Sequence, residues 1–419
     1  MDVSSGGAIV AGRFRPHGGR LGDAAPFKLY LPRSRSDVVT AVREARVLGQ
    51  RLTVRGAGDR PEECASAPGI VLSTERLDRI LSLHPGARTV TVEPGVLVHK
   101  LDEYLAGHSF GLAVGCSEPM RSVGSFAALG GVGPSSHQSG LFVDHVLAVE
   151  QVGSDLRART YRREGGASLA RQLRQGYGVP TKITLALVPV DKQRLSLGRT
   201  ARYFVRPSEF VLAAGRQLRS ASTARLQSAR FVDVPLGREA LTLGTVRWWH
   251  ERERRTSRVR TDAERGAGAL LAEALPQLSG RFGDALATLS LLTPRRASCA
   301  RAEREGASLA RVTVGTTRSY RLIVPEARFE AAFWALYGRA LRERREHGAI
   351  GAITLDVARV RTPSLGESHV EHCALRLTLG LAGHELGDRL AGFGAQLDGL
   401  CTTHAGSRLT LPTVSFAGH

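Results

Sequence analysis

The stretch RSVGSFAALGGVGPSSHQSGLFVDHV, residues 121–146, decides how this chain is interpreted. It holds too much glycine and serine for an ordinary helix, and too many apolar side chains for a solvated linker. Glycine permits positive φ angles and lets the backbone come close to a ligand. Successive N–H groups in such turns form a concavity that suits phosphate oxygens. The stretch alone therefore predicts either a phosphate-binding loop or a tightly packed turn among small residues.

Two other stretches favour the phosphate-binding alternative. LTVRGAGDRP covers residues 52–61, and QGYGVPTKITLALVP covers residues 175–189. In order and spacing, the three stretches resemble the flavin-binding domain of the vanillyl-alcohol oxidase and p-cresol methylhydroxylase family, which includes cytokinin dehydrogenases and berberine-bridge-type oxidases. The resemblance covers residues 26–189. It implies an α+β fold, in which an FAD-binding domain of two subdomains precedes a substrate domain built from an antiparallel sheet and helices.

The resemblance also divides the chain. Residues 1–192 are the expected FAD-binding domain of the p-cresol methylhydroxylase type, with subdomains at about 20–82 and 83–192. Residues 193–419 are the expected substrate domain. The C-terminal tail could pack back on the FAD-binding domain.

Local patterns predict a β-α-β opening. A helix is expected over residues 36–48, with Ser36 as its N-cap and Gly49 just beyond its C-terminus. A strand over residues 52–55 then runs into a glycine turn. Pro61 stands where a Rossmann fingerprint needs its third glycine, so a Rossmann dinucleotide site is not expected.

The second half of the chain carries no recognisable motif. Apolar spacing predicts a helix that starts at Pro207 and a clear helix over residues 326–347. Alternating segments predict strands, among them residues 319–325, 352–361 and 369–381. Strands with covering helices agree with the α+β substrate domain.

Net charge suggests nucleic acid, but the distribution of charge does not. Lys and Arg number 58 against 39 Asp and Glu, for a formal charge of +19. The cations are mostly Arg and are spread along the chain. Aromatic residues make up 5%, which leaves few platforms on which bases could stack. Nucleic acid is therefore not an expected partner, a small molecule is, and the oligomeric state stays open.

Apolar runs and cysteines indicate the compartment. No run approaches the roughly 20 apolar residues that span a bilayer. The N-terminal segment lacks the basic and apolar regions of a secretion signal. The 5 cysteines are scattered without a CxxC pair, which argues against a disulfide framework and a sulfur-rich zinc site. A cytoplasmic protein is expected.

The cofactor-binding positions that the resemblance implies belong to three loops. The first approaches the pyrophosphate of FAD, the second wraps the pyrophosphate and ribityl chain, and the third contacts the adenine end. The implied residues are Arg55, Gly56, Ala57, Gly58 and Asp59; Ser122, Val123, Gly124, Ser125, Gly131, Gly133, Ser135, Ser136, His137 and Gly140; and Gly178, Val179 and Thr181. Burial of a flavin needs backbone amides and small residues, and these segments supply both.

Three positions depart from the family pattern. Many relatives carry a flavin-bonded His directly after the first loop, where this chain has Asp59, so FAD is expected to be non-covalent. Cys116 lies near the second loop, but farther from it than the cysteine of a berberine-bridge-type thioether link, so a buried structural thiol is expected. Where the family has two consecutive glycines, this chain has Gly124 and Ser125, and the serine side chain narrows the space for the cofactor.

Three side chains are candidates for the catalytic base. A flavin accepts hydride at N5, so the acidic proton of the substrate needs an acceptor nearby. Glu118 is the carboxylate nearest the second loop. His369 and Glu371 share a face of the predicted strand 369–381, and in the resembling family this sheet covers the flavin. A solvated side chain is the alternative in each case.

The sequence gives weaker evidence for metal or anion binding than for FAD binding. The spacings of His369, His372 and His384 do not converge on a zinc ion, so no metal is expected. Tyr320, Arg321 and Arg359 are candidate anion-binding residues, although nothing in the sequence ranks them above other arginines.

The resemblance implies an FAD-dependent oxidoreductase, either an oxidase or a dehydrogenase. It would take hydride from an alcohol, amine or activated C–H carbon of a small organic substrate, with secondary metabolism as one setting. An alternative keeps the fold but has a structural flavin or none, and the protein then acts as a non-redox cyclase or binding scaffold. A nucleic-acid-associated protein is a third alternative.

Overall fold

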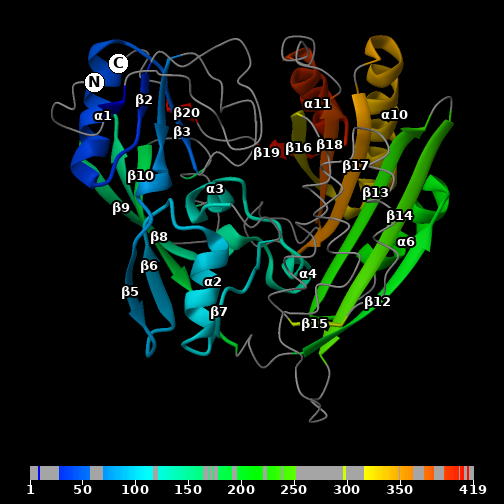
Figure 1. The fold of residues 1–419 in the computed structure, drawn as a ribbon, viewed down its shortest axis with the longest axis horizontal. Coiled ribbons are helices and arrows are strands. Elements are labelled where there is room, and N and C mark those ends of the chain that lie inside the picture. The colour runs from blue at the N-terminus through cyan, green and yellow to red at the C-terminus, as the bar shows by residue number, and fades with distance from the viewer. Residues whose placement is uncertain are drawn as a thin grey trace.

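A computed structural model describes residues 8–9, 28–56, 69–116, 121–163, 169, 173, 178–190, 196–219, 224–236, 239–251, 296–298, 316–348, 350–361, 372–381, 391–404, 406–409 and 413–414. The chain forms two lobes with short helix α4 (Ser136–Ser139) between them (Figure 1). The first lobe is mainly the N-terminal part of the chain, and the second lobe contains one large sheet. The α+β expectation is confirmed.

The first lobe contains two five-stranded sheets. The strand order of the first sheet is β1 (Ala8–Ile9), β2 (Lys28–Tyr30), β4 (Ile70–Ser73), β3 (Leu52–Arg55) and β20 (Thr413–Val414). Strands β2, β4 and β3 are parallel neighbours, and helix α1 (Arg35–Val47) connects β2 to β3. Strand β20 pairs antiparallel with β3, so a C-terminal strand lies among the first strands of the chain (Figure 1).

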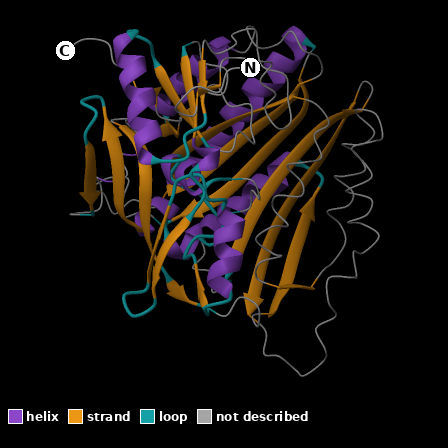
Figure 2. Ribbon diagram, turned by 60° about the vertical axis from the view of Figure 1, so that its left-hand side comes forward, coloured by secondary structure: helices purple, strands orange, loops and turns teal. Residues whose placement is uncertain are grey.

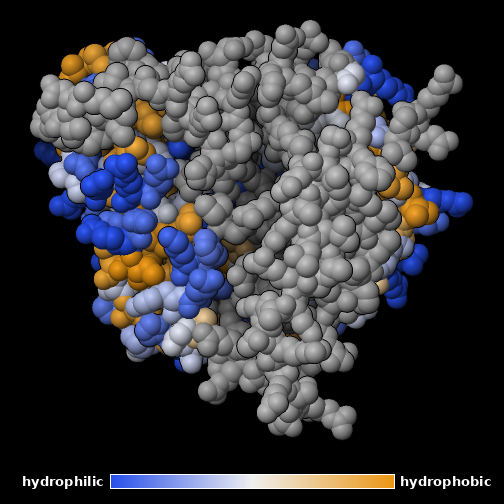
Figure 3. All heavy atoms as spheres, viewed as in Figure 1, coloured by the Kyte–Doolittle hydropathy of each residue, from blue (hydrophilic) through white to orange (hydrophobic). Residues whose placement is uncertain are grey.

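The second sheet is antiparallel throughout. Its order is β5 (Ile80–His84), β6 (Thr89–Val92), β10 (Gly178–Ala186), β8 (Val146–Gly153) and β9 (Ala158–Arg162). Helix α2 (Val98–Ala106) precedes β7 (Phe110–Gly111), which pairs with β11 (Val188–Pro189), and a 3₁₀ turn, η1 (Thr74–Arg76), follows β4. Hydrophilic side chains lie on the exposed face of α2 (Figure 3). Sequence patterns did not predict β5 or β9, and neither strand contains a fully buried residue.

Helix α1 joins the two sheets of the first lobe. Its buried residues Val38, Ala41, Val42 and Ala45 share a core with Val152 and Val179 from the second sheet. This packing fixes the position of one subdomain against the other, because a helix face that buries apolar area on both sheets is stabilised only when both are in place.

The predicted N-cap of α1, Ser36, lies two residues after the observed one. Ser34 is the N-cap, with its Oγ accepting from the Asp37 backbone N at 3.3 Å while Asp37 Oδ2 accepts from the Ser34 N at 3.1 Å. Ser36 lies inside the first turn, so its assignment was wrong. The acid three residues after Ser34 completes a capping box, which Ser36 lacks. Gly49, with φ of 60°, ends the helix as expected.

Residues 121–146 are more helical than their composition predicted. They form α3 (Val123–Ala128), α4 and the 3₁₀ turn η2 (Phe142–His145), joined by tight turns. Ser122 caps α3 through its Oγ, and Gly130 and Gly131 have φ of 79° and 72°, which stops the helix after six residues. The stretch is thus not one ordinary helix, as expected, but short helical pieces joined by turns. Glycines limit helix length here and do not prevent helix formation.

The second lobe is one eight-stranded antiparallel sheet with helices on one face (Figure 2). Its strand order is β15 (Arg296–Ser298), β12 (Ser196–Phe204), β14 (Glu239–Glu251), β13 (Leu226–Leu236), β17 (Ile350–Val360), β18 (His372–Leu381), β16 (Thr316–Pro325) and β19 (Ser407–Leu409). Helices α6 (Pro207–Arg219), α10 (Phe329–His347) and α11 (Ala391–Thr403) cover one face, and the 3₁₀ turn η4 (Glu326–Arg328) leads into α10.

The other face of the large sheet lies toward the first lobe. Ile323, Val360 and Ala374 from this face belong to the hydrophobic core of the first lobe. Two backbone hydrogen bonds add to the contact, from Gln227 N to Pro134 O at 2.8 Å and from Arg361 N to Ser136 O at 3.0 Å. The turn before α4 therefore packs directly on the sheet. Across the described segments, no helix has the length and apolarity needed to cross a bilayer.

Candidate functional site

The three loops that the sequence singled out meet at one place. Arg55 and Gly56 at the end of β3, Gly124 and Ser125 at the start of α3, and Gly178 at the start of β10 line a common crevice. We call it the glycine crevice; its other described lining residues are Val54, Thr74, Pro94, Ala128, Gln151, Leu173 and Pro180. It encloses about 480 Å³ of space that is partly open to solvent.

The glycines of the crevice are packed so closely against neighbouring residues that larger side chains would not fit. A Cβ added to Gly56 would lie 2.3 Å from Ser122 Oγ, and a Cβ on Gly124 would lie 2.8 Å from Pro94 Cβ. Ser125 Oγ donates to the Ser122 carbonyl at 3.0 Å, back along its own helix. The serine that departs from the paired glycines of the family is thus accommodated next to Gly56, although it still lines the crevice.

The crevice contains a buried cation and a buried amide. Arg55 is 6% exposed, and its Nη2 lies 3.8 Å from Glu75 Oε2. Burial lowers the pKa of Arg55, and the nearby Glu75 charge opposes this shift. Gln151 is also buried, and its Oε1 meets no hydrogen-bond partner among the described residues. A guanidinium, an amide and glycine backbones are groups that bind phosphate oxygens, so the crevice fits the pyrophosphate of a dinucleotide.

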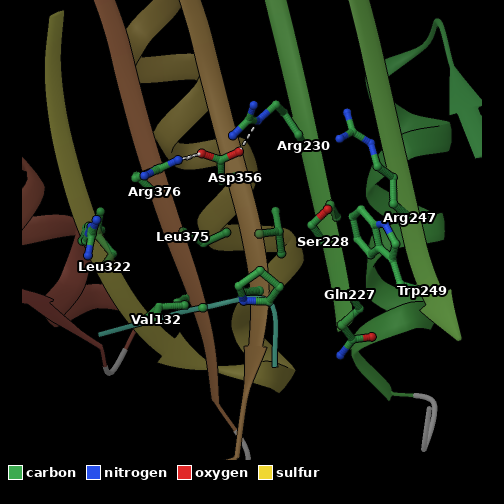
Figure 4. Close-up of a pocket in the computed structure, with 17 residues that line it drawn as sticks. Val132, Gln227, Ser228, Arg230, Arg247, Trp249, Leu322, Asp356, Leu375 and Arg376 are labelled. Carbon is green, nitrogen blue, oxygen red and sulfur yellow. Dashed lines mark hydrogen bonds and ion pairs between the residues drawn. The ribbon is translucent and has the colours of Figure 1, made fainter. Parts of the chain in front are cut away.

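A second cavity lies between the large sheet and the turn before α4 (Figure 4). We call it the arginine pocket, after Arg230, Arg247, Arg321 and Arg376, which line it from β13, β14, β16 and β18. Its other lining residues are Val132, Gly133, Pro134, Gln227, Ser228, Ala229, Trp249, Leu322, Asp356, Val357, Ala358, Ala374 and Leu375. About 820 Å³ of empty space lies between these residues, and part of it is open to solvent.

Asp356 joins two of these arginines. Its Oδ1 accepts from Arg230 Nε, and its Oδ2 accepts from Arg376 Nε at 2.8 Å and Nη2 at 2.5 Å (Figure 4). Burial by itself would raise the pKa of Asp356, but the charges and hydrogen bonds of the two guanidinium groups outweigh it and hold that pKa well below its usual range. Asp356 is therefore ionised near neutral pH and is a poor general base.

Residues 121–146 line both cavities. Gly124, Ser125 and Ala128 face the glycine crevice, and Val132, Gly133 and Pro134 line the arginine pocket. A Cβ on Gly133 would lie 2.0 Å from the Gly115 carbonyl oxygen, so the turn has no room for a side chain there. One continuous segment thus connects a crevice suited to phosphate with a larger pocket on the sheet.

Several implied cofactor residues have other contacts in this structure. Ser135 Oγ donates to the Ala113 carbonyl at 2.9 Å, and Ser136 Oγ accepts from Gly133 N at 2.9 Å. His137 Nε2 lies 2.9 Å from the Ala224 carbonyl in the second lobe. Burial lowers the pKa of His137, although that carbonyl contact opposes the shift. These three residues hold the turn in place and tie it to the large sheet.

The remaining implied positions serve the packing of the first lobe. Val123 and Val179 are buried in its cores. Thr181 Oγ1 donates to Glu150 Oε1 at 2.8 Å. Gly131 and Gly140 both have positive φ, and a Cβ on Gly131 would lie 2.2 Å from Phe142 Cβ.

Several candidate residues lie outside the described part of the chain. These are Ala57, Gly58, Asp59, Glu118, His369, Glu371 and His384. Among the residues that are described, no three His, Cys, Asp or Glu side chains are grouped as metal ligands. Cys116 is half-buried beside the core of the first lobe and forms no disulfide with the described residues.

The candidate anion-binding residues separate from one another. Arg321 lines the arginine pocket, whereas Tyr320 packs on the Phe393 ring in the helix-covered core. Arg359 Nε lies 3.8 Å from Glu326 Oε2. Sequence reasoning missed Arg230, Arg247, Asp356 and Arg376. The available signal was a charged residue between apolar neighbours in a predicted strand, as at Leu375-Arg376-Leu377, because such a residue lies on the face opposite the core.

The comparisons with known proteins assign the first lobe. Residues 26–155 match the family model described as an FAD binding domain. D-arabinono-1,4-lactone oxidase from Eremothecium gossypii is 30% identical over 118 residues, which are 27% of this chain and 22% of that protein. Aclacinomycin-N/aclacinomycin-A oxidase from Streptomyces galilaeus is 32% identical over 152 residues, which are 35% of this chain and 26% of that protein. The chain thus spans about a quarter of the length of these relatives.

A solved structure extends the likeness to both lobes. The crystal structure of 6-hydroxy-D-nicotine oxidase from Arthrobacter nicotinovorans superposes with a TM-score of 0.60 at 16% identity, covering 93% of this chain and 83% of that one. At this identity the likeness concerns the fold. It confirms the expected order of an FAD-binding domain of the p-cresol methylhydroxylase type and an antiparallel sheet with helices. FAD is accordingly the cofactor of the first lobe.

Proposed function

We propose that this chain, whose residues 26–155 match an FAD binding domain, is an FAD-dependent oxidoreductase of the vanillyl-alcohol oxidase type. It takes hydride from an alcohol, amine or activated C–H carbon of a small organic substrate. One observation carries the proposal: residues 121–146 line both a crevice that fits pyrophosphate and a second cavity against the large sheet. The matching relatives named as oxidases agree with a redox role.

We assign separate roles to the two cavities: one binds the cofactor and the other binds the substrate. Arg55, the Gln151 amide and the backbone around Gly56 and Gly124 would hold the pyrophosphate in the glycine crevice. When bound, FAD supplies the hydride acceptor. The arginine pocket holds and orients the substrate.

We propose that the group that accepts the substrate proton lies outside the described lining of the arginine pocket. Asp356 is the single carboxylate that the described residues place there, and its two guanidinium partners keep it ionised. Glu118, His369 and Glu371 therefore stay our candidates for the base.

We also propose that FAD is held without a covalent bond, because Asp59 stands where many relatives have the flavin-bonded His. A cytoplasmic location stays a prediction. Among the described cysteines, Cys116, Cys373 and Cys401 form no disulfide.

Purification and anaerobic reduction test the proposal. We expect a yellow protein that releases its flavin on acid precipitation, and a flavin band that bleaches without oxygen when a substrate from a panel of alcohols, amines and acids is added. Protein that stays colourless and takes up no added FAD would contradict it. Bound flavin that no panel member bleaches would favour the non-redox cyclase or scaffold.

A matched pair of variants tests the role of the crevice. Arg55→Gln removes the buried cation, and we expect FAD affinity to fall by about tenfold or more, since a hydrogen bond to a charged group contributes roughly 1.5–3 kcal/mol. Arg51→Gln removes an exposed arginine four residues earlier and should leave FAD affinity unchanged. Equal losses in both variants would mean that overall charge, and not the crevice, sets the affinity.

A further inference from the structure

We propose that Trp249 donates its indole N–H to a carbonyl oxygen of the substrate, so that the substrate of this oxidoreductase is a carbonyl compound with an apolar carbon skeleton. The word substrate rests on the proposed function, while binding of a carbonyl compound in the arginine pocket does not. Three observations carry the inference: a buried donor without an acceptor, its position on the wall of the pocket, and the small side chains that line the same space.

The donor is the indole N–H of Trp249. Trp249 is 2% exposed, and its Nε1 meets no hydrogen-bond acceptor within the described part of the chain. A buried N–H in this state is costly, because it has lost its hydrogen bonds to water without replacing them. Indole N–H can only donate. A ligand that brings an acceptor atom to Nε1 would therefore remove this cost.

Trp249 stands on the wall of the arginine pocket. It lies on β14 two residues from Arg247, so both side chains are on the face of the sheet that lines the pocket. Arg247 is opposite Ser228 in the register of β14 and β13. Figure 4 shows the Trp249 ring leaning from β14 toward Ser228. Trp248, its neighbour in sequence, packs against the helix-covered core on the other face. The Trp249 indole is thus the one of the two that a ligand in the pocket can reach.

Small side chains leave the space of the pocket empty. Ser228, Ala358 and Ala374 lie on the pocket face of β13, β17 and β18, and Ala358 is directly opposite Ala374. Val132 and Pro134, from the turn before α4, line the same cavity. Alanine, valine and proline offer apolar surface, which suits the carbon skeleton of a ligand.

A carbonyl oxygen fits this donor better than a hydroxyl does. A carbonyl accepts a hydrogen bond and adds no donor, whereas a hydroxyl brings an O–H of its own. In the pocket, the Asp356 carboxylate already accepts from Arg230 and Arg376. The Gly133 and Pro134 carbonyls already accept from backbone N–H groups. The bound carbonyl orients the substrate, and the hydride leaves from another carbon, because the carbonyl carbon of a ketone carries no hydrogen.

Nuclear magnetic resonance of the oxidised, FAD-loaded protein tests the inference without turnover. The chain has 3 tryptophans, so each indole N–H resonance can be assigned with a Trp→Phe variant. Cyclohexanone and acetophenone would be compared with methylenecyclohexane and α-methylstyrene, in which a methylene group replaces the oxygen. We expect each ketone to shift the Trp249 resonance downfield until saturation, and to bind about three- to tenfold more tightly than its alkene, as one net hydrogen bond predicts.

Three results overturn the inference. The first is a Trp249 resonance that none of the ketones moves. The second is an alkene that binds as tightly as its ketone. The third concerns the kind of acceptor: 1-phenylethanol that binds more tightly than acetophenone would show that the pocket selects a hydroxyl and not a carbonyl.

Variants locate the effect. Trp249→Phe keeps an aromatic ring but removes the donor, so ketone and alkene should bind within about twofold of each other. Trp334→Phe is the control, because Trp334 is 39% exposed on α10, which packs on the other face of the sheet, and it should keep the ketone preference. If Trp249→Phe fails to fold, the resonance and the ligand pairs on the unchanged protein still decide. A ketone preference that survives in Trp249→Phe contradicts the assignment.

Failure of the two proposals gives different results. An FAD-loaded protein whose flavin is reduced by a substrate that leaves the Trp249 resonance unmoved keeps the proposed function and removes this inference. A protein that binds ketones through Trp249 while no substrate reduces its flavin removes the redox function and keeps the carbonyl site.

Discussion

The glycine crevice and the arginine pocket are built in different ways. The crevice consists of turns and small residues from three loops, and close packing leaves no room for side chains at Gly56 or Gly124. The pocket consists of long charged side chains on strands that are neighbours in the sheet but distant in sequence. The crevice therefore depends on local backbone shape, whereas the arginine pocket depends on which strands become neighbours. The predictions below probe that difference, beginning with the segment that belongs to both cavities.

Gly133→Ala should have the largest effect. The new Cβ would lie 2.0 Å from the Gly115 carbonyl oxygen and 2.9 Å from Val114 Cγ1, so the backbone must shift. We expect unfolding stability to fall by about 3 kcal/mol and flavin content to fall with it. Gly86→Ala is the control, because nothing lies within 4 Å of its Cβ position. Thermal unfolding and flavin absorbance per protein measure both. A variant as stable as Gly86→Ala would show that the turn is not tightly packed.

Asp356→Asn should destabilise the second lobe by about 2 kcal/mol, because two part-buried guanidinium groups lose a charged partner. FAD affinity should stay unchanged, since the glycine crevice is untouched. If the variant loses flavin and substrate binding alike, the two cavities are coupled more strongly than their separate linings indicate.

The pH dependence of the same residue gives a second measurement. The pKa of Asp356 is lowered on folding, so its contribution to stability is present above its unfolded pKa of about 3.9 and is lost as the pH falls toward the folded pKa. Urea unfolding between pH 3 and pH 7 should therefore show a shallower acid dependence for the Asn variant. If the Asn variant and the unchanged protein show the same acid dependence, the ion pairs of Asp356 do not contribute to stability as expected.

The difference between the cavities also explains what could be predicted from the sequence. Gly56, Gly124 and Gly178 were found because a glycine turn leaves a local pattern, and the crevice brings them together. Arg230 and Arg376 were missed because only the register of β13, β17 and β18 places them beside Asp356. Pairing of distant strands is a long-range property, and single-sequence periodicity reports only the face on which each residue lies.

His137 links the crevice side to the pocket side through the Ala224 carbonyl. Burial lowers the pKa of His137, so the stability that its neutral form contributes is present above its unfolded pKa of 6.5 and is lost as the pH falls below it. We expect His137→Gln to lose about 1 kcal/mol at pH 8 and to show a weaker loss between pH 7 and pH 5.

The control for His137 is the exposed His108 at the end of α2. Both variants would be compared with the unchanged protein by denaturant unfolding between pH 5 and pH 8. If both variants flatten the curve equally, the pH dependence does not come from the contact between the lobes.

The smallest effect belongs to helix α1, far from the arginine pocket. Ser34→Ala removes the side-chain cap on the Asp37 N–H and should lower unfolding stability by about 1 kcal/mol. Ser36→Ala should change it by much less, because Ser36 lies inside the first turn and its exposed hydroxyl contacts only Ser34 Oγ, at 2.7 Å, among the side chains described. Urea unfolding of the two variants compares them directly. A larger loss for Ser36 would restore the N-cap that the sequence first indicated, and a change in acetophenone binding by either variant would show that effects at α1 reach the second lobe.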